Sequence, residues 1–211
     1  MNTVDDQLNT LFTIGYATLS KDRFLWLLKI NIIEAIADVR SNPYSKLYPE
    51  FNHEILKDTL RRHGIKYVFL GKELGAQRKE EECYTNRKVC YDLVYKTESF
   101  QEGIRRLTNG LSKMKVALLC AEKDPIDCHR TILICRYIRD KIPHIKHILN
   151  NGKLEDHSEL EMRLLKLFSL NNMELFRAQK DILEDAYQKQ AERIAFSKEE
   201  IVSKERKYSS G

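Results

Sequence analysis

The sequence contains 211 residues, of which 42% are hydrophobic and 32% are charged, a composition typical of a globular protein with a buried core. Its 36 basic and 31 acidic residues give a formal net charge of +5, which suits a phosphate-bearing partner but is too small for a protein built only to bind DNA. No apolar run reaches the roughly 20 residues of a membrane span, and residues 1–6 do not resemble a secretory signal. The five cysteines lack a disulfide pattern. We therefore expect a cytoplasmic protein with reduced thiols and no membrane contact.

Short apolar runs alternate with amphipathic segments between residues 11 and 150. Strands are expected where the apolar runs are too short for a buried helix and end at turn residues, which are 11–16, 33–40, 66–70, 116–120 and 145–149. Helices are expected where apolar side chains recur at helical spacing, which are the segments after Ser20 and at 52–63, 99–113 and 157–170. This alternation predicts an α/β fold with a mainly parallel, five-stranded sheet.

Three further segments complete the predicted organisation. Residues 76–92 are polar, and we expect them to form a long loop or a lid over the site. Residues 151–171 are expected to close the domain with a helix. Residues 172–211 are expected to be a helical arm, since the stretch from Met173 to Lys207 contains no Gly or Pro and carries mixed charge. We expect this arm to pack or to bind a partner protein or a second copy, and not to contribute to the site.

The segment from Val116 to Arg130 combines a buried strand with a cluster of reactive residue types. Cys120 ends the predicted strand, and Asp124-Pro125 is typical of a helix start, with an acidic N-cap and Pro at the first helical position. Cys128, His129 and Arg130 would then lie in the first helical turn, where free amides favour an anion and bias a thiol toward thiolate. Helical geometry would point Cys128 and Arg130 in different directions, so we expect Arg130 to face the site and Cys128 to be a half-buried apolar residue.

Polar residues follow each of the first four predicted strands. Because parallel strands end at the same edge of a sheet, these residues are expected to line one crevice there. The candidates are Tyr16, Arg40, Ser41, Asn42, Glu73, Cys120, Glu122, His129 and Arg130.

Several of these motifs occur together in one known family. The motifs are Thr13-Ile14-Gly15-Tyr16, Asp38 to Ser45, Phe51-Asn52, Glu73-Leu74-Gly75, Cys120-Ala121-Glu122 and Cys128-His129-Arg130. In this order they resemble domain-of-unknown-function family 488 over roughly residues 11–150, although Gly75-Ala76-Gln77-Arg78 stands where that family often has Gly-Gly-Arg. The resemblance implies a Rossmann-like, three-layer α/β domain for residues 11–150. It brings no settled reaction, so the chemistry has to be inferred from the residues.

The first functional interpretation is an enzyme or sensor that acts on a nucleotide or nucleic acid. Arg40 and Arg130 suit bidentate phosphate contacts, and Tyr16, Ser41, Asn42 and His129 would complete the binding site. Glu122 and Glu73 could form the carboxylate pair of hydrolytic or N-glycosidic chemistry, one as base or nucleophile and the other as acid.

Three alternatives remain open. Cys120, near His129 and Arg130, would be a rhodanese-like nucleophile if its pKa were depressed, although the following loop does not match. Cys120, Cys128 and His129 could bind a metal or an iron–sulfur cluster. However, seven residues separate the cysteines, unlike structural zinc motifs, and the side chains of the adjacent helical residues Cys128 and His129 would point in different directions. Neither metal nor cofactor is therefore expected. The third alternative is a binding module without catalysis.

Overall fold

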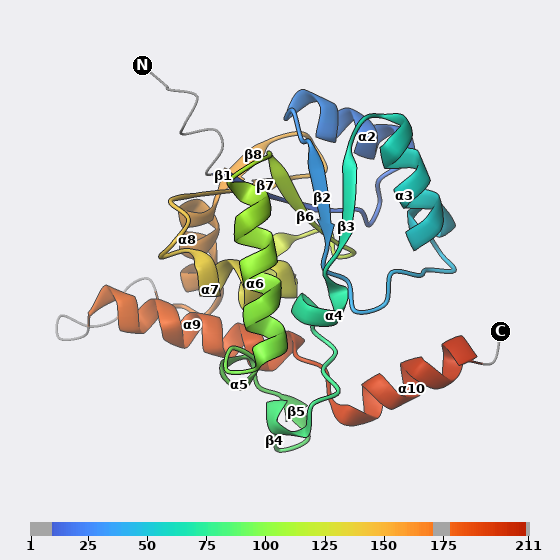
Figure 1. Cartoon of the computed structure of the whole chain (residues 1–211). Helices are drawn as coiled ribbons and strands as arrows, with labels where there is room; N and C mark the ends of the chain where they lie inside the picture. Colours follow the sequence, from blue (N-terminus) through green and yellow to red (C-terminus); the bar gives the residue numbers. More distant parts are fainter. Residues whose placement is uncertain (1–9, 171–177, 210–211) are drawn as a thin grey trace.

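A six-stranded sheet forms the centre of the structure, a computed structural model that describes residues 10–170 and 178–209 (Figure 1). The strand order is β3-β2-β6-β1-β7-β8, and all neighbouring pairs are parallel except β7 with β8. The strands are β1 (Thr10–Gly15), β2 (Ala35–Asp38), β3 (Lys66–Phe69), β6 (Val116–Cys120), β7 (His144–Ile148) and β8 (Leu154–Asp156). The expected Rossmann-like α/β architecture with a mainly parallel sheet is confirmed.

The sheet has one strand more than expected. Residues 151–171 contain β8 before the expected helix, because Gly152 turns the chain back along β7. Its φ of 92° is readily adopted only by glycine, and its N–H donates to the Leu149 carbonyl at 2.8 Å. A strand of three residues with a single buried side chain has too little periodicity to be recognised in a sequence.

Helices cover both faces of the sheet, which gives three layers. On one face, Phe24 and Leu56 pack against Ile14 and Ile36 of the sheet. The helices of this face are α2 (Lys21–Ile30) and α3 (His53–Arg62), as Figure 1 shows. The opposite face is covered by α6 (Glu98–Leu111), α8 (His157–Leu167) and α9 (Gln179–Ile194), together with the short elements η4 (Arg130–Cys135) and α7 (Arg136–Ile138).

The segment 76–92 is structured, contrary to the expected loop or lid. It contains η2 (Glu81–Cys83), a hairpin of β4 (Tyr84–Thr85) and β5 (Lys88–Val89), and the start of α5 (Tyr91–Val94). Asn86 and Arg87 both have positive φ, which is the geometry of a tight hairpin turn. The Val89 N–H donates to the Phe196 carbonyl at 3.0 Å, so residues far along the chain hold the hairpin in place.

The C-terminal segment packs onto the domain. Helix α9 buries Ile182, Ala186 and Tyr187 in the same core cluster as Leu118 and Ile132. Helix α10 (Lys198–Ser209) follows it, while residues 172–177 and 210–211 of the expected arm lie outside the described part of the chain. Among the described residues, no helix is long and apolar enough to cross a membrane.

Candidate functional site

A crevice of about 610 Å³ lies where the strands β1, β2 and β6 end. The parallel register places Gly15 beside Cys120 and Asp38 beside Leu119, so the segments that follow these strands meet at one edge. The lining residues are Tyr16, Arg40, Ser41, Asn42, Tyr44, Ser45, Lys46, Leu47, Ala76, Gln77, Cys120, Ala121, Glu122, His129 and Phe196. Seven of the nine expected site residues are among them, and Glu73 and Arg130 are not.

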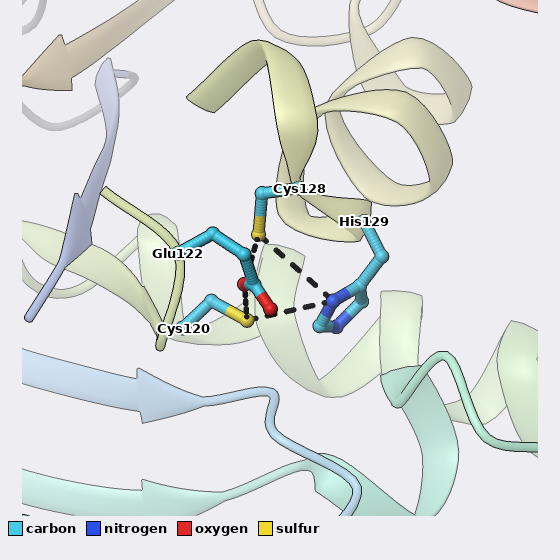
Figure 2. Close-up of side chains that lie close together, drawn as sticks. All are labelled: Cys120, Glu122, Cys128 and His129. Atoms are coloured by element: carbon cyan, nitrogen blue, oxygen red, sulfur yellow. Dashed lines mark hydrogen bonds between the residues drawn. The ribbon is translucent and has the colours of Figure 1, made fainter. Parts of the chain in front are cut away.

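Four side chains with metal-ligating atoms lie close together (Figure 2), and three of them, Cys120, Glu122 and His129, line this crevice. The Sγ atoms of Cys120 and Cys128 each lie 2.9 Å from Oε2 of Glu122. The Nδ1 atom of His129 lies 3.5 Å from Sγ of Cys120 and 4.0 Å from Sγ of Cys128. Cys120, Cys128 and His129 are buried, whereas Glu122 is an exposed residue whose carboxylate is desolvated by its place in the cluster.

The position of Cys128 differs from the expectation because the helix starts later than expected. Asp124 caps only the 3-10 turn η3 (Pro125–Asp127), where its side chain accepts the Ile126 N–H at 3.0 Å. Cys128 is then extended, with φ −130° and ψ 139°, and η4 begins at Arg130. The spacing of side chains around a helix therefore does not apply to Cys128, and its thiol points into the cluster (Figure 2).

The orientation of His129 is fixed by the second strand. Its Nε2 lies 3.0 Å from the carbonyl oxygen of Val39, which can only accept a hydrogen bond. Nε2 therefore carries a proton, and in the neutral ring Nδ1 presents its lone pair to the two sulfur atoms. A histidine held in this way is typical of metal ligands.

The electrostatics of the cluster argue against a free thiolate. Burial raises the pKa of the Cys120 thiol and raises that of Cys128 well above its ordinary value. Burial also acts to raise the pKa of Glu122, but His129 and the two S–H donors outweigh it and hold that pKa below its usual range. In the metal-free cluster, Glu122 is thus a carboxylate that accepts two hydrogen bonds, one from each thiol. The depressed thiol pKa that a rhodanese-like nucleophile requires is absent.

Arg130 lies beneath the crevice and does not face it, contrary to expectation. It is 1% exposed, and its Nη1 donates at 2.8 Å to the carbonyl oxygen of Glu122. Its Nε donates to Oγ1 of Thr13 at 3.3 Å. Gly15 makes this arrangement possible, because a Cβ at that position would lie 1.8 Å from the same Glu122 carbonyl oxygen.

Arg40 is the guanidinium that lines the crevice. Asp38 holds it through two hydrogen bonds, from Nε to Oδ1 at 2.9 Å and from Nη2 to Oδ2 at 2.6 Å. Its Nη1 is buried and has no hydrogen-bond partner among the described residues. The ring of Tyr16 lies 5.1 Å from the guanidinium carbon and is stacked on Phe51, so the arginine is fixed on two sides.

Glu73 is separate from the crevice, so the expected pair with Glu122 does not form there. It lies on the short helix α4 (Gly71–Leu74) and forms an ion pair with Arg106 of α6. The backbone after β3 enters this helix at once, which turns the Glu73 side chain toward α6 instead of the neighbouring strand ends. Glu73 is therefore held by an arginine, Arg106, and is not available to act with Glu122.

Several lining residues were not expected from the sequence. Lys46 and Leu47 lie in the polar loop after β2, and the adjoining Ser41–Ser45 turn was a usable signal for them. Phe196 carried no such signal, because only folding brings the segment after α9 against the crevice. The expectation that the C-terminal segment does not contribute to the site is therefore wrong.

Comparison with known proteins adds one finding. A family model described as "Domain of unknown function DUF488" matches residues 20–137, which is more than half of the chain and includes the four clustered residues. No curated protein matches the chain.

Proposed function

The chain belongs to the DUF488 family, a family of unknown function. From the lining of the crevice at the carboxyl edge of the sheet, we propose that it is an enzyme that hydrolyses a phosphate-bearing substrate, a nucleotide or nucleic acid. The proposal names Arg40 as the main phosphate ligand and Glu122 as the group that acts on the attacking water.

The unpartnered Nη1 of Arg40 is the observation that carries the proposal. A buried polar hydrogen without an acceptor is costly, so such groups are retained where a ligand supplies the acceptor. Asp38 fixes the guanidinium from behind and keeps its position before any ligand arrives. A guanidinium with a free N–H edge matches the geometry of phosphate oxygens better than any other side chain.

The remaining lining fits a nucleotide in both chemistry and size. Asn42 and Lys46 add polar and cationic groups near Arg40 for phosphate oxygens. Tyr44, Leu47 and Phe196 provide apolar and aromatic surface against which a base can pack. The volume of about 610 Å³ lies within the range of roughly 300–1,000 Å³ of small-molecule sites.

Hydrolysis is favoured over the other expected reactions. Glu122 is the only carboxylate among the lining residues, and a single carboxylate can act as general base toward water. The N-glycosidic version needs a second carboxylate across the scissile bond, and Glu73 is engaged with Arg106 elsewhere. The thiol version is not favoured because burial raises the pKa of Cys120.

The proposal is tested by calorimetric titration with inorganic phosphate, nucleoside mono-, di- and triphosphates and short oligonucleotides, followed by a search for hydrolysis of the ligands that bind. We expect Lys46→Ala and Arg40→Lys each to weaken binding by about tenfold or more, since charge or the planar fork is lost. Lys113→Ala, an exposed lysine outside the crevice, is the matched control. If these compounds bind but are not hydrolysed, the protein is a binding module and the proposed hydrolysis is refuted. If no phosphate compound binds, the whole proposal is refuted.

A further inference from the structure

We propose that Cys120, Cys128, His129 and Glu122 bind one zinc-type divalent cation at the crevice. Binding of the ion stands on the geometry of these four residues alone. Only the use of the ion to activate water rests on the function proposed above.

The four donor atoms already have nearly the spacing of a tetrahedral site. They all lie within 4.8 Å of one another, with pair distances of 2.9, 2.9, 3.5 and 4.0 Å among the hydrogen-bonded ones. With bonds of about 2.0–2.3 Å, a tetrahedral zinc ion separates its ligands by roughly 3.3–3.8 Å. Displacements of less than an ångström at Glu122 Oε2 would bring its two contacts with the sulfur atoms into this range.

The donor set selects the type of metal. Two sulfur atoms and one imidazole nitrogen are ligands of zinc and similar borderline ions, whereas magnesium and calcium take oxygen ligands almost exclusively. The seven residues between the two cysteines exceed the two to four residues of short structural zinc motifs. Here the extended Cys128 returns the chain to the end of β6, so a separation of seven residues brings both sulfur atoms to one point.

Contacts around the cluster hold the ligands as known metal sites do. The Val39 carbonyl oxygen accepts the Nε2–H of His129, which leaves Nδ1 for the ion. The backbone N–H of Arg130 lies 3.5 Å from Sγ of Cys128 and would stabilise a sulfur ligand that carries negative charge.

The charge balance favours a divalent ion. Metal binding releases the protons of both thiols, so one divalent ion replaces two protons and the total charge of the cluster stays at that of the Glu122 carboxylate. The buried guanidinium of Arg130 forms no ion pair with a carboxylate in the described part of the chain, and it donates to the carbonyl oxygens of Glu122 and Lys123. Its positive charge thus stays matched by the cluster before and after the ion binds.

The exposed position of Glu122 indicates what the ion can do. Three buried ligands and one carboxylate from an exposed residue resemble catalytic zinc sites, in which three protein ligands hold the ion and the fourth position is open to water. A water molecule from the crevice can replace the carboxylate, which then remains beside the water as a base.

The test uses the reduced, full-length protein after removal of metals, titrated with Co²⁺ and then with Zn²⁺. We expect one equivalent of cobalt to bind, with near-ultraviolet thiolate-to-cobalt charge transfer and the intense visible bands of tetrahedral cobalt, and zinc to displace it. X-ray absorption of the zinc form should show two sulfur scatterers at about 2.3 Å. Failure to bind one equivalent, or a six-coordinate spectrum without sulfur, would overturn the proposal.

Variants identify the ligands. Cys128→Ser and Cys120→Ser should each lower the zinc affinity by at least about 100-fold and reduce the charge-transfer band by about half, since one of two sulfur ligands is lost. Cys90→Ser, a cysteine outside the cluster, should leave both unchanged. Glu122→Gln should keep the charge-transfer band. If a cluster variant does not fold, the cobalt absorption and zinc X-ray absorption spectra of the unmodified protein decide whether two sulfur atoms bind the ion. If the protein binds phosphate but takes up no zinc, only the metal proposal is refuted. If it takes up zinc but binds no phosphate compound, only the proposed function is refuted.

Discussion

His147 of β7 and His157 of α8 share a buried hydrogen bond of 3.0 Å between Nε2 of the first ring and Nδ1 of the second. Thr13 lies 2.8 Å from Nδ1 of His147, and the Tyr187 hydroxyl lies 3.0 Å from Nε2 of His157 and donates to Glu161. One direction of donation satisfies the whole chain, provided that both rings are neutral. Thr13 donates to His147, His147 to His157 and His157 to Tyr187.

This pair predicts that the protein loses stability below neutral pH. Burial lowers the pKa of His157 to about 4 and that of His147 well below its ordinary value. Histidines in the unfolded chain have a pKa near 6.5, so between about pH 6.5 and 4 the unfolded chain binds more protons than the folded one. As the pH is lowered through this window, the free energy of unfolding therefore falls by about 1.4 kcal/mol per pH unit for each ring. Urea unfolding at several pH values measures the slope.

The control for this prediction is His157→Gln, which keeps hydrogen-bonding groups at this position but removes one titrating ring. Its stability should depend less steeply on pH over the same window, by about the contribution of one ring. An unchanged slope in this variant would show that other groups cause the acid sensitivity.

Gly15 should tolerate no side chain. A Cβ there would lie 1.8 Å from the Glu122 carbonyl oxygen, and Gly15 itself is held at the end of β1 by its pairing with Cys120 of β6. Gly15→Ala should lower the free energy of unfolding by about 2–4 kcal/mol through forced displacement of that carbonyl. Gly110→Ala is the matched control, because its Cβ would meet only Val116 at 3.7 Å, and it should be neutral or stabilise helix α6 by up to about 1 kcal/mol. Thermal and urea unfolding of both variants decide, and equal effects would contradict the steric argument.

The sequence was sufficient for the elements that depend on local patterns. The apolar runs ending at Gly15 and Cys120 are buried parallel strands, and Ser20 caps α2 by accepting the Arg23 N–H at 3.2 Å. Because these strands end at one edge, the sequence alone predicts that Tyr16 and Arg40 line one crevice, as they do.

The parts that sequence reasoning missed depend on the exact backbone path or on distant contacts. Whether Asp124 starts a helix or a single 3-10 turn depends on competing hydrogen bonds, and this choice decides the direction of Cys128. The direction of the Glu73 side chain depends on its contact with Arg106, which lies 33 residues away in the sequence. The meeting of Cys120, Glu122, Cys128 and His129 in one cluster, and the separation of Glu73 from Glu122, therefore depend on the folded backbone and not on local sequence patterns.

The two glutamates of that expected pair should behave differently in an activity assay. Glu122→Gln should lower kcat by about 10²–10⁴, the range for loss of a general base, because Glu122 lines the crevice. Glu73→Gln should change kcat by less than about threefold and mainly weaken the contact with Arg106, an exposed ion pair worth about 1 kcal/mol or less. Steady-state kinetics with the substrate identified by titration give the comparison. A large loss of kcat in folded Glu73→Gln protein would restore the two-carboxylate mechanism.

Phe196 should contribute to ligand binding although it lies outside the region matched by the family model. Its backbone carbonyl accepts the Val89 N–H at 3.0 Å, and this contact ties the segment after α9 to the hairpin of β4 and β5. The aromatic ring is half-buried at the crevice, where a base can pack against it. Stacking of one base on an aromatic side chain is worth about 1–3 kcal/mol, so Phe196→Ala should weaken nucleotide binding by about 5- to 100-fold.

The same variant should leave binding of inorganic phosphate nearly unchanged, since phosphate has no base and Arg40 remains in place. Val202→Ala, at an exposed position of α10, is the control for a general effect of changing the C-terminal segment. Calorimetric titration of the three proteins with a nucleotide and with phosphate separates the two contributions. Equal loss for both ligands would mean that Phe196 only supports the fold of the crevice, because a stacking contact acts on the base alone.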